Sequence, residues 1–185
     1  MYLEIEAKLK VDSFEPVERR LVEQGASLVS ETIQTDTYFD TAAGDLTRTD
    51  QCLRLRVEAM HGQEYLALTY KGPKQADDFK RRKEVNLNVT DAAAAESLLE
   101  GLGYRRALAF NKQRREWKLN DCLVALDTLP LLGTFVEIEG VNSSIIRKVQ
   151  ETLGLTDVPH VMDSYASLVE AALSRLESKR REVFL

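Results

Sequence analysis

Residues 3–10 read Leu-Glu-Ile-Glu-Ala-Lys-Leu-Lys, and apolar and charged side chains alternate along them without interruption. A period of two residues is that of a β-strand, in which successive side chains point to opposite faces of the sheet. One face therefore carries Leu3, Ile5, Ala7 and Leu9, and the other carries Glu4, Glu6, Lys8 and Lys10. The stretch predicts a strand whose charged face is as regular as its apolar face.

The same alternation recurs farther along the chain. It is clear over residues 52–58, 64–71 and 82–89, and extended segments are also predicted over 36–40, 104–117, 123–127 and 134–139. Amphipathic helices are predicted between them, capped at Ser13, Asp91, Asn142 and Asp163, and Lys179 to Arg181 is interpreted as a solvated helix end. Seven or eight such strands predict one closed antiparallel sheet with helices over its apolar face.

A faint internal repeat accompanies this pattern. The segments Glu4-x-Glu6-x-Lys8 and Arg82-x-Glu84-x-Asn86 stand 78 positions apart, and each is followed by a helix, a glycine and an extended segment. The sequence therefore predicts a duplicated strand–helix–strand unit.

The polar strand faces carry charges of one sign in pairs. Acidic pairs stand two residues apart at Glu4/Glu6 and Glu137/Glu139, and basic pairs at Arg54/Arg56 and Lys112/Arg114. A solvated sheet face explains any single pair well, but it does not require repeated pairs of one sign. Because the opposite faces are apolar and helices are available to cover them, the four pairs favour a barrel whose charged faces line its interior.

Charged side chains inside a barrel must be neutralised, because each buried unpaired charge costs several kcal/mol. Carboxylates without histidine or cysteine are hard oxygen ligands suited to Mg²⁺ or Mn²⁺. Arginines and lysines around a cavity match the oxygens of phosphate groups. The pattern predicts a pocket for a metal-bound polyphosphate, built without the glycine-rich loop GxxxxGK[ST], which the sequence does not contain.

Composition excludes several other classes of protein. The 185 residues include 25 Lys and Arg against 30 Asp and Glu, and a net charge of −5 argues against a nucleic-acid binder. No apolar run approaches the roughly 18 residues of a membrane span, and the charged first strand does not resemble a signal peptide. Cys52 and Cys122 form no disulfide framework. We expect a cytoplasmic protein with a single domain over residues 1–185 and no nucleic-acid or membrane partner.

The stretch Glu4-Ile5-Glu6-Ala7-Lys8 resembles the ExExK signature of the CYTH superfamily, the triphosphate tunnel metalloenzymes. Further matches follow in order along the chain: Tyr38-Phe39-Asp40, Leu53-Arg54-Leu55-Arg56, Thr69-Tyr70-Lys71-Gly72-Pro73, Arg82-x-Glu84, Lys112-x-Arg114, Leu126-Asp127, Leu132-Gly133-x-Phe135-x-Glu137-x-Glu139 and Ser164-Tyr165. The resemblance implies an α+β fold, with an eight-stranded antiparallel closed β-barrel, the triphosphate tunnel, covered by outer helices.

The resemblance also implies roles for individual residues. The metal-binding carboxylates would be Glu4, Glu6, Glu137 and Glu139, with Glu84 and Asp127 nearby. The phosphate-binding cations would be Lys8, Arg54, Arg56, Lys71, Arg82, Lys112 and Arg114. Lys8 and Lys112 are the candidates for a catalytic base. Asn86 stands where many members carry a second acid, which leaves the number of metal ions open.

Two groups of neighbouring residues allow a second interpretation. Asp36, Tyr38 and Asp40 share one strand face, and a position at the tunnel mouth or in a packed core is equally compatible with the sequence. Lys80, Arg81 and Lys83 follow a polar loop and are interpreted only as residues that attract anions.

The predicted function is that of a class IV adenylyl cyclase, which converts ATP to cyclic AMP and pyrophosphate with Mg²⁺ or Mn²⁺. Hydrolysis of inorganic, nucleoside or thiamine triphosphate is the alternative within the superfamily. A polyphosphate-binding module without turnover is a third hypothesis, disfavoured because the module would not need the two acidic pairs. The substrate partner is ATP or another triphosphate, and a homodimer through exposed helix faces is compatible with the sequence.

Overall fold

The structure is a computed structural model that describes residues 2–60 and 62–185. Its strands are β1 (Tyr2–Val11), β2 (Ser27–Thr41), β3 (Cys52–Met60), β4 (Gln63–Lys71), β5 (Lys80–Val89), β6 (Tyr104–Leu119), β7 (Cys122–Leu129), β8 (Gly133–Gly140) and β9 (Glu182–Val183). Its helices are α1 (Glu15–Glu23), α2 (Asp45–Arg48), α3 (Ala92–Gly101), α4 (Ser143–Thr152) and α5 (Tyr165–Arg175).

Eight of these strands close into an antiparallel barrel. Neighbours around the barrel follow the order β2-β3-β4-β5-β1-β8-β7-β6, and β2 pairs with β6 to complete the ring. The short strand β9 pairs with β6 in parallel, away from the β7 pairing. The predicted α+β fold with an eight-stranded closed barrel is confirmed.

The predicted repeat also appears in the fold. The unit β1-α1-β2 has the same order as β5-α3-β6. Each strand of the first unit pairs antiparallel with its counterpart, β1 with β5 and β2 with β6. Exchanging β1 to β4 with β5 to β8 leaves the order of neighbours around the barrel unchanged. The barrel is therefore two similar halves joined along both of these strand pairs.

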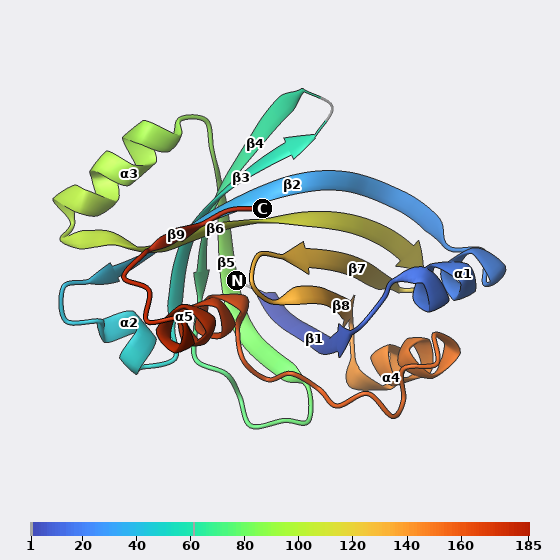
Figure 1. Ribbon diagram of the computed structural model, residues 1–185. Helices are drawn as coiled ribbons and strands as arrows, with labels where there is room; N and C mark the ends of the chain where they lie inside the picture. The colour runs from blue at the N-terminus through green and yellow to red at the C-terminus, as the bar shows by residue number, and fades with distance from the viewer. Residues whose placement is uncertain (1, 61) are drawn as a thin grey trace.

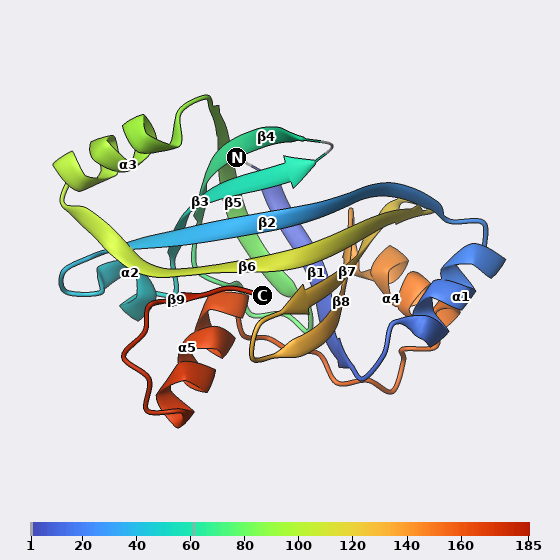
Figure 2. The same ribbon diagram turned by 45° about the horizontal axis from the view of Figure 1, so that its top comes forward.

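The apolar strand faces point outward and are covered by helices. Ile5 and Leu9 of β1 are at most 6% exposed and pack with Val17 of α1 and Val149 of α4. Separate apolar clusters join α5 to β6 and β8, and α3 to β2 and β3. Figures 1 and 2 show α1 and α4 together on one side of the barrel and α3 on the opposite side. Because these faces are used on the outside, the charged faces of the same strands line the interior.

The helix caps agree with the sequence in part. Asp91 accepts a hydrogen bond from the Ala94 amide, and Asn142 accepts one from the Ile145 amide, as predicted. The predicted Asp163 cap is wrong, because Ser164 is the N-cap and its hydroxyl accepts from the Ser167 amide. Ser13 lies one residue before the N-cap of α1 and accepts from the Glu15 amide.

The chain end is the second difference from the sequence interpretation. Helix α5 ends at Arg175, and Glu177 has a φ of 50°, a left-handed conformation that does not continue a helix. The basic segment before β9 is therefore not a helix end but a connection back to the barrel, where the Arg181 carbonyl accepts from the Ala109 amide. Within the described ranges, no helix combines the length and the hydropathy needed to cross a membrane.

Candidate active site

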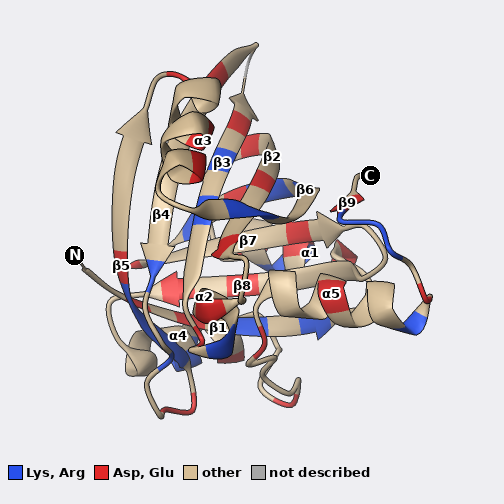
Figure 3. Cartoon of the chain, turned by 90° about the vertical axis from the view of Figure 1, so that its left-hand side faces the viewer, with Lys and Arg blue, Asp and Glu red and all other residues tan. Residues whose placement is uncertain are grey.

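The interior of the barrel holds a polar cavity of about 350 Å³. Its wall is formed by inward side chains of β1, β2, β3, β4, β5, β6 and β8, and by Ser164 and Tyr165 at the start of α5. Basic and acidic side chains both lie along these strands (Figure 3), and β1 and β5 each carry both kinds on the face that lines the cavity. All the site residues expected from the sequence line the cavity except Asp127.

Asp36 fixes the two arginines of β3. Its carboxylate accepts from Arg56 Nε at 2.6 Å and from Arg56 Nη2 at 2.7 Å, and Arg54 Nη1 lies 3.5 Å away. Burial favours the neutral carboxyl, but the Arg56 and Arg54 guanidiniums hold the pKa of Asp36 well below its ordinary value. Asp36 thus holds the two cations in fixed directions.

The sequence left two positions open for Tyr38 and Asp40, one at the tunnel mouth and one in a packed core, and the structure places the two residues differently. Tyr38 lines the cavity and also stacks on Phe110 with ring centroids 5.4 Å apart. The Asp40 carboxylate instead accepts from the backbone amides of Leu46 and Thr47, both in α2. Tyr38 belongs to the wall of the cavity, whereas Asp40 stabilises the first turn of a helix.

Asp127 lies behind the wall and is fully buried. It accepts from Arg114 Nε at 2.7 Å, from Lys112 Nζ at 2.9 Å and from the Tyr165 hydroxyl at 3.0 Å. Despite burial, Arg114 and Lys112 hold the pKa of Asp127 below its ordinary value. The structure therefore places Asp127 where it orients two basic side chains of β6, and its direct binding to a metal ion stays a prediction.

Lys8 and Lys112 are each 2% exposed. Burial, reinforced by the neighbouring Lys80, lowers the pKa of Lys8 to about 7, and burial together with Arg114 lowers the pKa of Lys112 to about 8. Lys8 Nζ lies 3.4 Å from Glu137 Oε1 and donates to the Asp163 carbonyl at 3.1 Å. Both lysines are partly neutral near neutral pH, which is the state in which an amine accepts a proton.

Lys80, which was interpreted from the sequence only as attracting anions, lines the cavity, and its Nζ lies 2.5 Å from Glu6 Oε1. A signal for this position was present in the sequence. Lys80 stands two residues before Arg82 and four before Glu84, so it shares their strand face, and the error came from starting the strand at residue 82.

Tyr165 is the second residue that sequence reasoning missed, because Ser164-Tyr165 appeared only as a match to the family and no role was expected for Tyr165. Its hydroxyl donates to Asp127, and its ring centroid lies 3.9 Å from Lys8 Nζ and 5.0 Å from Lys112 Nζ. Contact between a cation and an aromatic face is favourable at these distances. No local sequence pattern predicts this role, because an amphipathic helix predicts that Tyr165 is buried but not which side chains it contacts.

The acidic side of the cavity is formed by β1 and β8. Glu6 stands directly opposite Glu139 in the strand register. Burial, followed by the charges of Glu4 and Glu6, raises the pKa of Glu139 to about 7. These carboxylates are hard oxygen donors of the kind that Mg²⁺ and Mn²⁺ prefer. The donor set therefore fits a divalent cation.

A metal site is not preformed in this arrangement. Among residues 2–60 and 62–185, no three Asp, Glu, His or Cys side chains converge closely enough to hold an ion. Glu4 and Glu6 instead bind Lys71 and Lys80. Carboxylates of the right chemistry are present, and side-chain rotation would be needed to bring them together.

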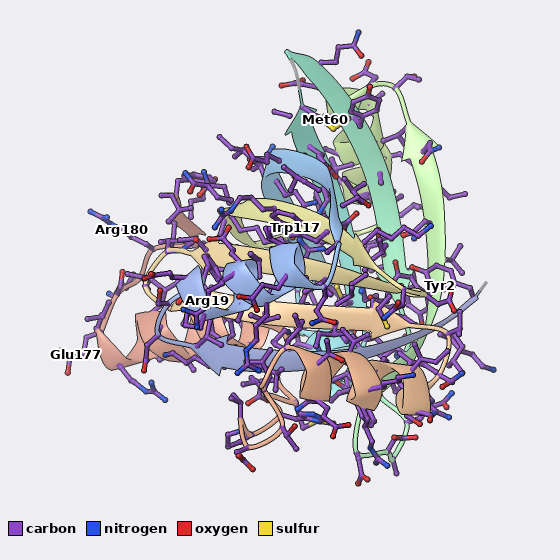
Figure 4. All side chains as sticks on the ribbon, turned by 90° about the vertical axis from the view of Figure 1, so that its right-hand side faces the viewer. Tyr2, Arg19, Met60, Trp117, Glu177 and Arg180 are labelled. Carbon is purple, nitrogen blue, oxygen red and sulfur yellow. The ribbon has the colours of Figure 1, made fainter. Side chains whose placement is uncertain are left out.

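Asn86 lines the cavity beside Tyr2, and Tyr2 lies at the start of β1 (Figure 4). The Asn86 side-chain amide donates to Glu84 Oε1 at 2.8 Å and to the Tyr2 hydroxyl at 3.4 Å. Burial raises the pKa of Glu84, but the combined opposing effects of the Lys71 charge and of hydrogen bonds from Lys71 and Asn86 lower it to about 2. At the position where the resemblance implied a second acid, the chain thus has a neutral donor that, with Lys71, helps to keep Glu84 ionised.

Comparisons with known proteins point to a single family. The profile of the CYTH domain family matches residues 2–153. The chain is 31% identical over 146 residues to "Putative adenylate cyclase MJ0240" of Methanocaldococcus jannaschii, which covers 79% of this chain and 81% of that protein. It is also 31% identical over 150 residues to "Adenylate cyclase CyaB" of Aeromonas hydrophila, with coverage of 76% and 74%. The PH1819 protein of Pyrococcus horikoshii OT3 superposes with a TM-score of 0.80 at 26% identity, over 91% of this chain and 98% of that chain.

Proposed function

This chain belongs to the CYTH domain family, and on that premise we propose that it is a divalent-metal-dependent enzyme acting on triphosphates. The reaction that we favour is conversion of ATP to cyclic AMP and pyrophosphate, the activity that both curated relatives carry in their names. The observation that carries the proposal is the cavity wall, in which buried and half-buried cations from five strands surround one space that also holds carboxylates of β1 and β8.

The cationic side has the chemistry of a phosphate site. Arg56 and Arg114 are held in fixed directions by Asp36 and Asp127. In the described part of the chain, Arg54 Nε and Arg82 Nε are buried and have no hydrogen-bond partner. A buried donor left without an acceptor costs about 1–3 kcal/mol, and a phosphate oxygen would satisfy it. The wall thus combines oriented cations with unused donors.

Glu4, Glu6 and Glu139 are the residues that would hold the divalent cation, with Glu137 beside them on β8. When bound, Mg²⁺ or Mn²⁺ would neutralise charge on the phosphate oxygens and lower the pKa of the attacking hydroxyl. Arg54, Arg56 and Arg114 would stabilise charge that develops on the leaving pyrophosphate. Lys8 or Lys112 would accept the proton of the ribose 3′-hydroxyl, because each has a lowered pKa inside the cavity.

Hydrolysis of a triphosphate is the second candidate. Lys8 lies beside the carboxylates of Glu137 and Glu6. A water molecule bound near those carboxylates could therefore lose its proton to Lys8 and attack the terminal phosphorus. The same cations would bind the phosphates in both reactions. Cyclisation and hydrolysis would therefore differ in how deep the triphosphate lies in the cavity and in whether the nucleoside is bound.

A binding module without turnover is the candidate with least support. It would keep the cations of the wall but would have no use for buried acids that repel its anionic ligand. Glu4, Glu6, Glu137 and Glu139 all line the cavity.

Product analysis separates these candidates. ATP, inorganic triphosphate and thiamine triphosphate are each incubated with the protein and either Mg²⁺ or Mn²⁺. We expect cyclic AMP and pyrophosphate from ATP, with a rate that rises toward alkaline pH because the 3′-hydroxyl is then more easily deprotonated. ADP and orthophosphate from ATP, or rapid cleavage of inorganic triphosphate without a cyclic nucleotide, would assign the protein to the hydrolases. No turnover of any of the three would leave the binding module.

A further inference from the structure

Two lysines inside the cavity bind the carboxylates that would hold a metal ion. Lys71 Nζ lies 2.8 Å from both oxygens of Glu4 and 2.7 Å from Glu84 Oε2. Lys71 donates hydrogen bonds to both Glu4 oxygens, and its contact with Glu84 Oε2 is an ion pair. Lys80 Nζ lies 2.5 Å from Glu6 Oε1. In this arrangement the Lys71 ammonium lies between the carboxylates of Glu4 and Glu84, and Glu4 and Glu6 each hold a cation of the protein itself.

The charges of the wall are close to balance on their own. The basic side chains of the lining are Lys8, Arg54, Arg56, Lys71, Lys80, Arg82, Lys112 and Arg114, and the acidic ones are Glu4, Glu6, Glu58, Glu84, Glu137 and Glu139. Asp36, Asp50 and Asp127 bind cations of this lining from outside it. A triphosphate can therefore gain these cations only if some of the carboxylates receive another positive charge.

The other two lysines of the cavity, Lys8 and Lys112, make no such close contact with Glu4, Glu6 or Glu84. Lys112 binds Asp127 behind the wall. Lys8 binds the Asp163 carbonyl and the Tyr165 ring, and its Nζ is 3.9 Å from Glu6 Oε1. The close contacts with Glu4, Glu6 and Glu84 belong to Lys71 and Lys80.

We propose that Lys71 and Lys80 are exchangeable counter-ions, which neutralise Glu4, Glu84 and Glu6 until a divalent cation takes those oxygens and then become free to bind the triphosphate. The inference rests on the proposed function, because it concerns the same cavity and the same two ligands. It adds that the cation and the triphosphate strengthen each other's binding, since each releases the groups that the other needs. Such coupling is reciprocal by thermodynamic necessity.

The test measures Mn²⁺ binding directly, from the electron paramagnetic resonance signal of the free ion. The titration is run alone and with a methylene-bridged triphosphate analogue, which is not cleaved, and is corrected for complexes between Mn²⁺ and the analogue in solution. The variants are Lys71→Met and Lys80→Met, which keep most of the side-chain length and remove the charge. The matched control is Lys83→Met, an exposed position on the outward face of β5.

In the wild type we expect the analogue to tighten Mn²⁺ binding on the order of tenfold, within the usual range of such coupling. In each Met variant, Mn²⁺ alone should bind more tightly than to the wild type, because its competitor for the carboxylates has gone. The tightening by the analogue should fall by several-fold in each variant and stay unchanged in Lys83→Met. Weaker Mn²⁺ binding in the Met variants, or undiminished coupling, would overturn the proposal.

Two further measurements keep the result interpretable. If a Met variant does not fold, as judged by circular dichroism, the wild-type titration still decides, because lack of any coupling there contradicts the exchange. Lys71→Arg and Lys80→Arg retain the charge and should bind Mn²⁺ as weakly as the wild type does. Turnover is assayed separately: an Mn²⁺ affinity that is the same in Lys80→Met as in the wild type would refute the exchange, whereas absent turnover with intact coupling would refute only the proposed enzyme activity.

Discussion

At the scale of single residues, the site depends on which charges have a partner. Asp36, Asp127 and Glu84 each bind a cation of the wall, and each has a pKa below its ordinary value. Glu139 differs, because it is largely buried and stands opposite Glu6 in the strand register, with the charge of Glu4 also acting on it. A carboxyl that is buried among like charges and has a raised pKa favours binding of an additional cation.

The pH dependence of stability follows from Glu139. Its pKa is about 7 in the folded protein against 4.5 ordinarily, so the folded state binds this proton more tightly than the unfolded state does. The associated stability is present below pH 4.5 and is lost as the pH rises through about 7. Without divalent metal, Glu139→Gln should therefore raise the free energy of unfolding at pH 8 by roughly 1–3 kcal/mol, and by less at pH 5.

Urea unfolding at the two pH values, in the presence of a chelator, checks this expectation. Glu151→Gln on the exposed face of α4 is the matched control and should leave the pH dependence as it is in the wild type. A Glu139→Gln protein that loses stability at pH 8 would mean that the carboxylate is well paired in the folded state.

Glu6 is the carboxylate whose removal should affect catalysis most. It lines the cavity and faces Glu139 in the register, while its neighbours on β1 are Glu4 and Lys8. Glu6→Gln keeps the size of the side chain and removes a charge that we assign to metal binding, so turnover should fall on the order of 100-fold or more. Steady-state kinetics measure the loss, with folding checked by circular dichroism. Wild-type activity in a folded Glu6→Gln protein would remove Glu6 from the proposed metal site.

At the scale of elements, the alternation of each strand determines which of its side chains face the barrel interior and therefore which can contact one another. The alternation in β1 was sufficient to predict that Glu4, Glu6 and Lys8 share a face, and the structure places that face inside the barrel. In β5 the same rule applied to Lys80, but the strand was expected to begin two residues too late. A strand boundary is set by pairing with its neighbour, here β1, and that pairing is not visible in the local sequence.

Strand phase makes a testable prediction about stability. Val136 on β8 points outward into the core beneath the helices and is not exposed. A carboxylate there would be buried without a partner, so Val136→Asp should lose about 4 kcal/mol or more, or fail to fold. Leu87→Asp, at an outward position of β5 that is 58% exposed, should stay within about 1 kcal/mol of the wild type. Urea unfolding compares the two, and equal losses would contradict the assignment of faces.

At the scale of the whole molecule, closure of the barrel turns a set of strand patterns into one site. The sequence predicted the closed sheet and most of the lining, because alternation and like-charge pairs are local properties of each strand. It did not predict that Asp127 lies behind the wall, since that depends on how far Arg114 and Lys112 reach across neighbouring strands. Nor did it predict Tyr165, which reaches the cavity because α5 packs across the barrel and lies outside the segment matched by the family profile.

The central claim is that the barrel interior is built for a triphosphate chain, and thermal unfolding with phosphates of different length tests it most directly. A ligand that binds only the folded state at 100 times its dissociation constant stabilises it by about 2.7 kcal/mol, which for a chain of this size raises the melting temperature by roughly 5–10 °C. With Mg²⁺ and at equal ionic strength, we predict such a shift for inorganic triphosphate and a much smaller one for orthophosphate at the same concentration. Equal shifts for the two anions would contradict the claim, because they would mean that the protein responds to anionic charge in general and not to the length of the phosphate chain.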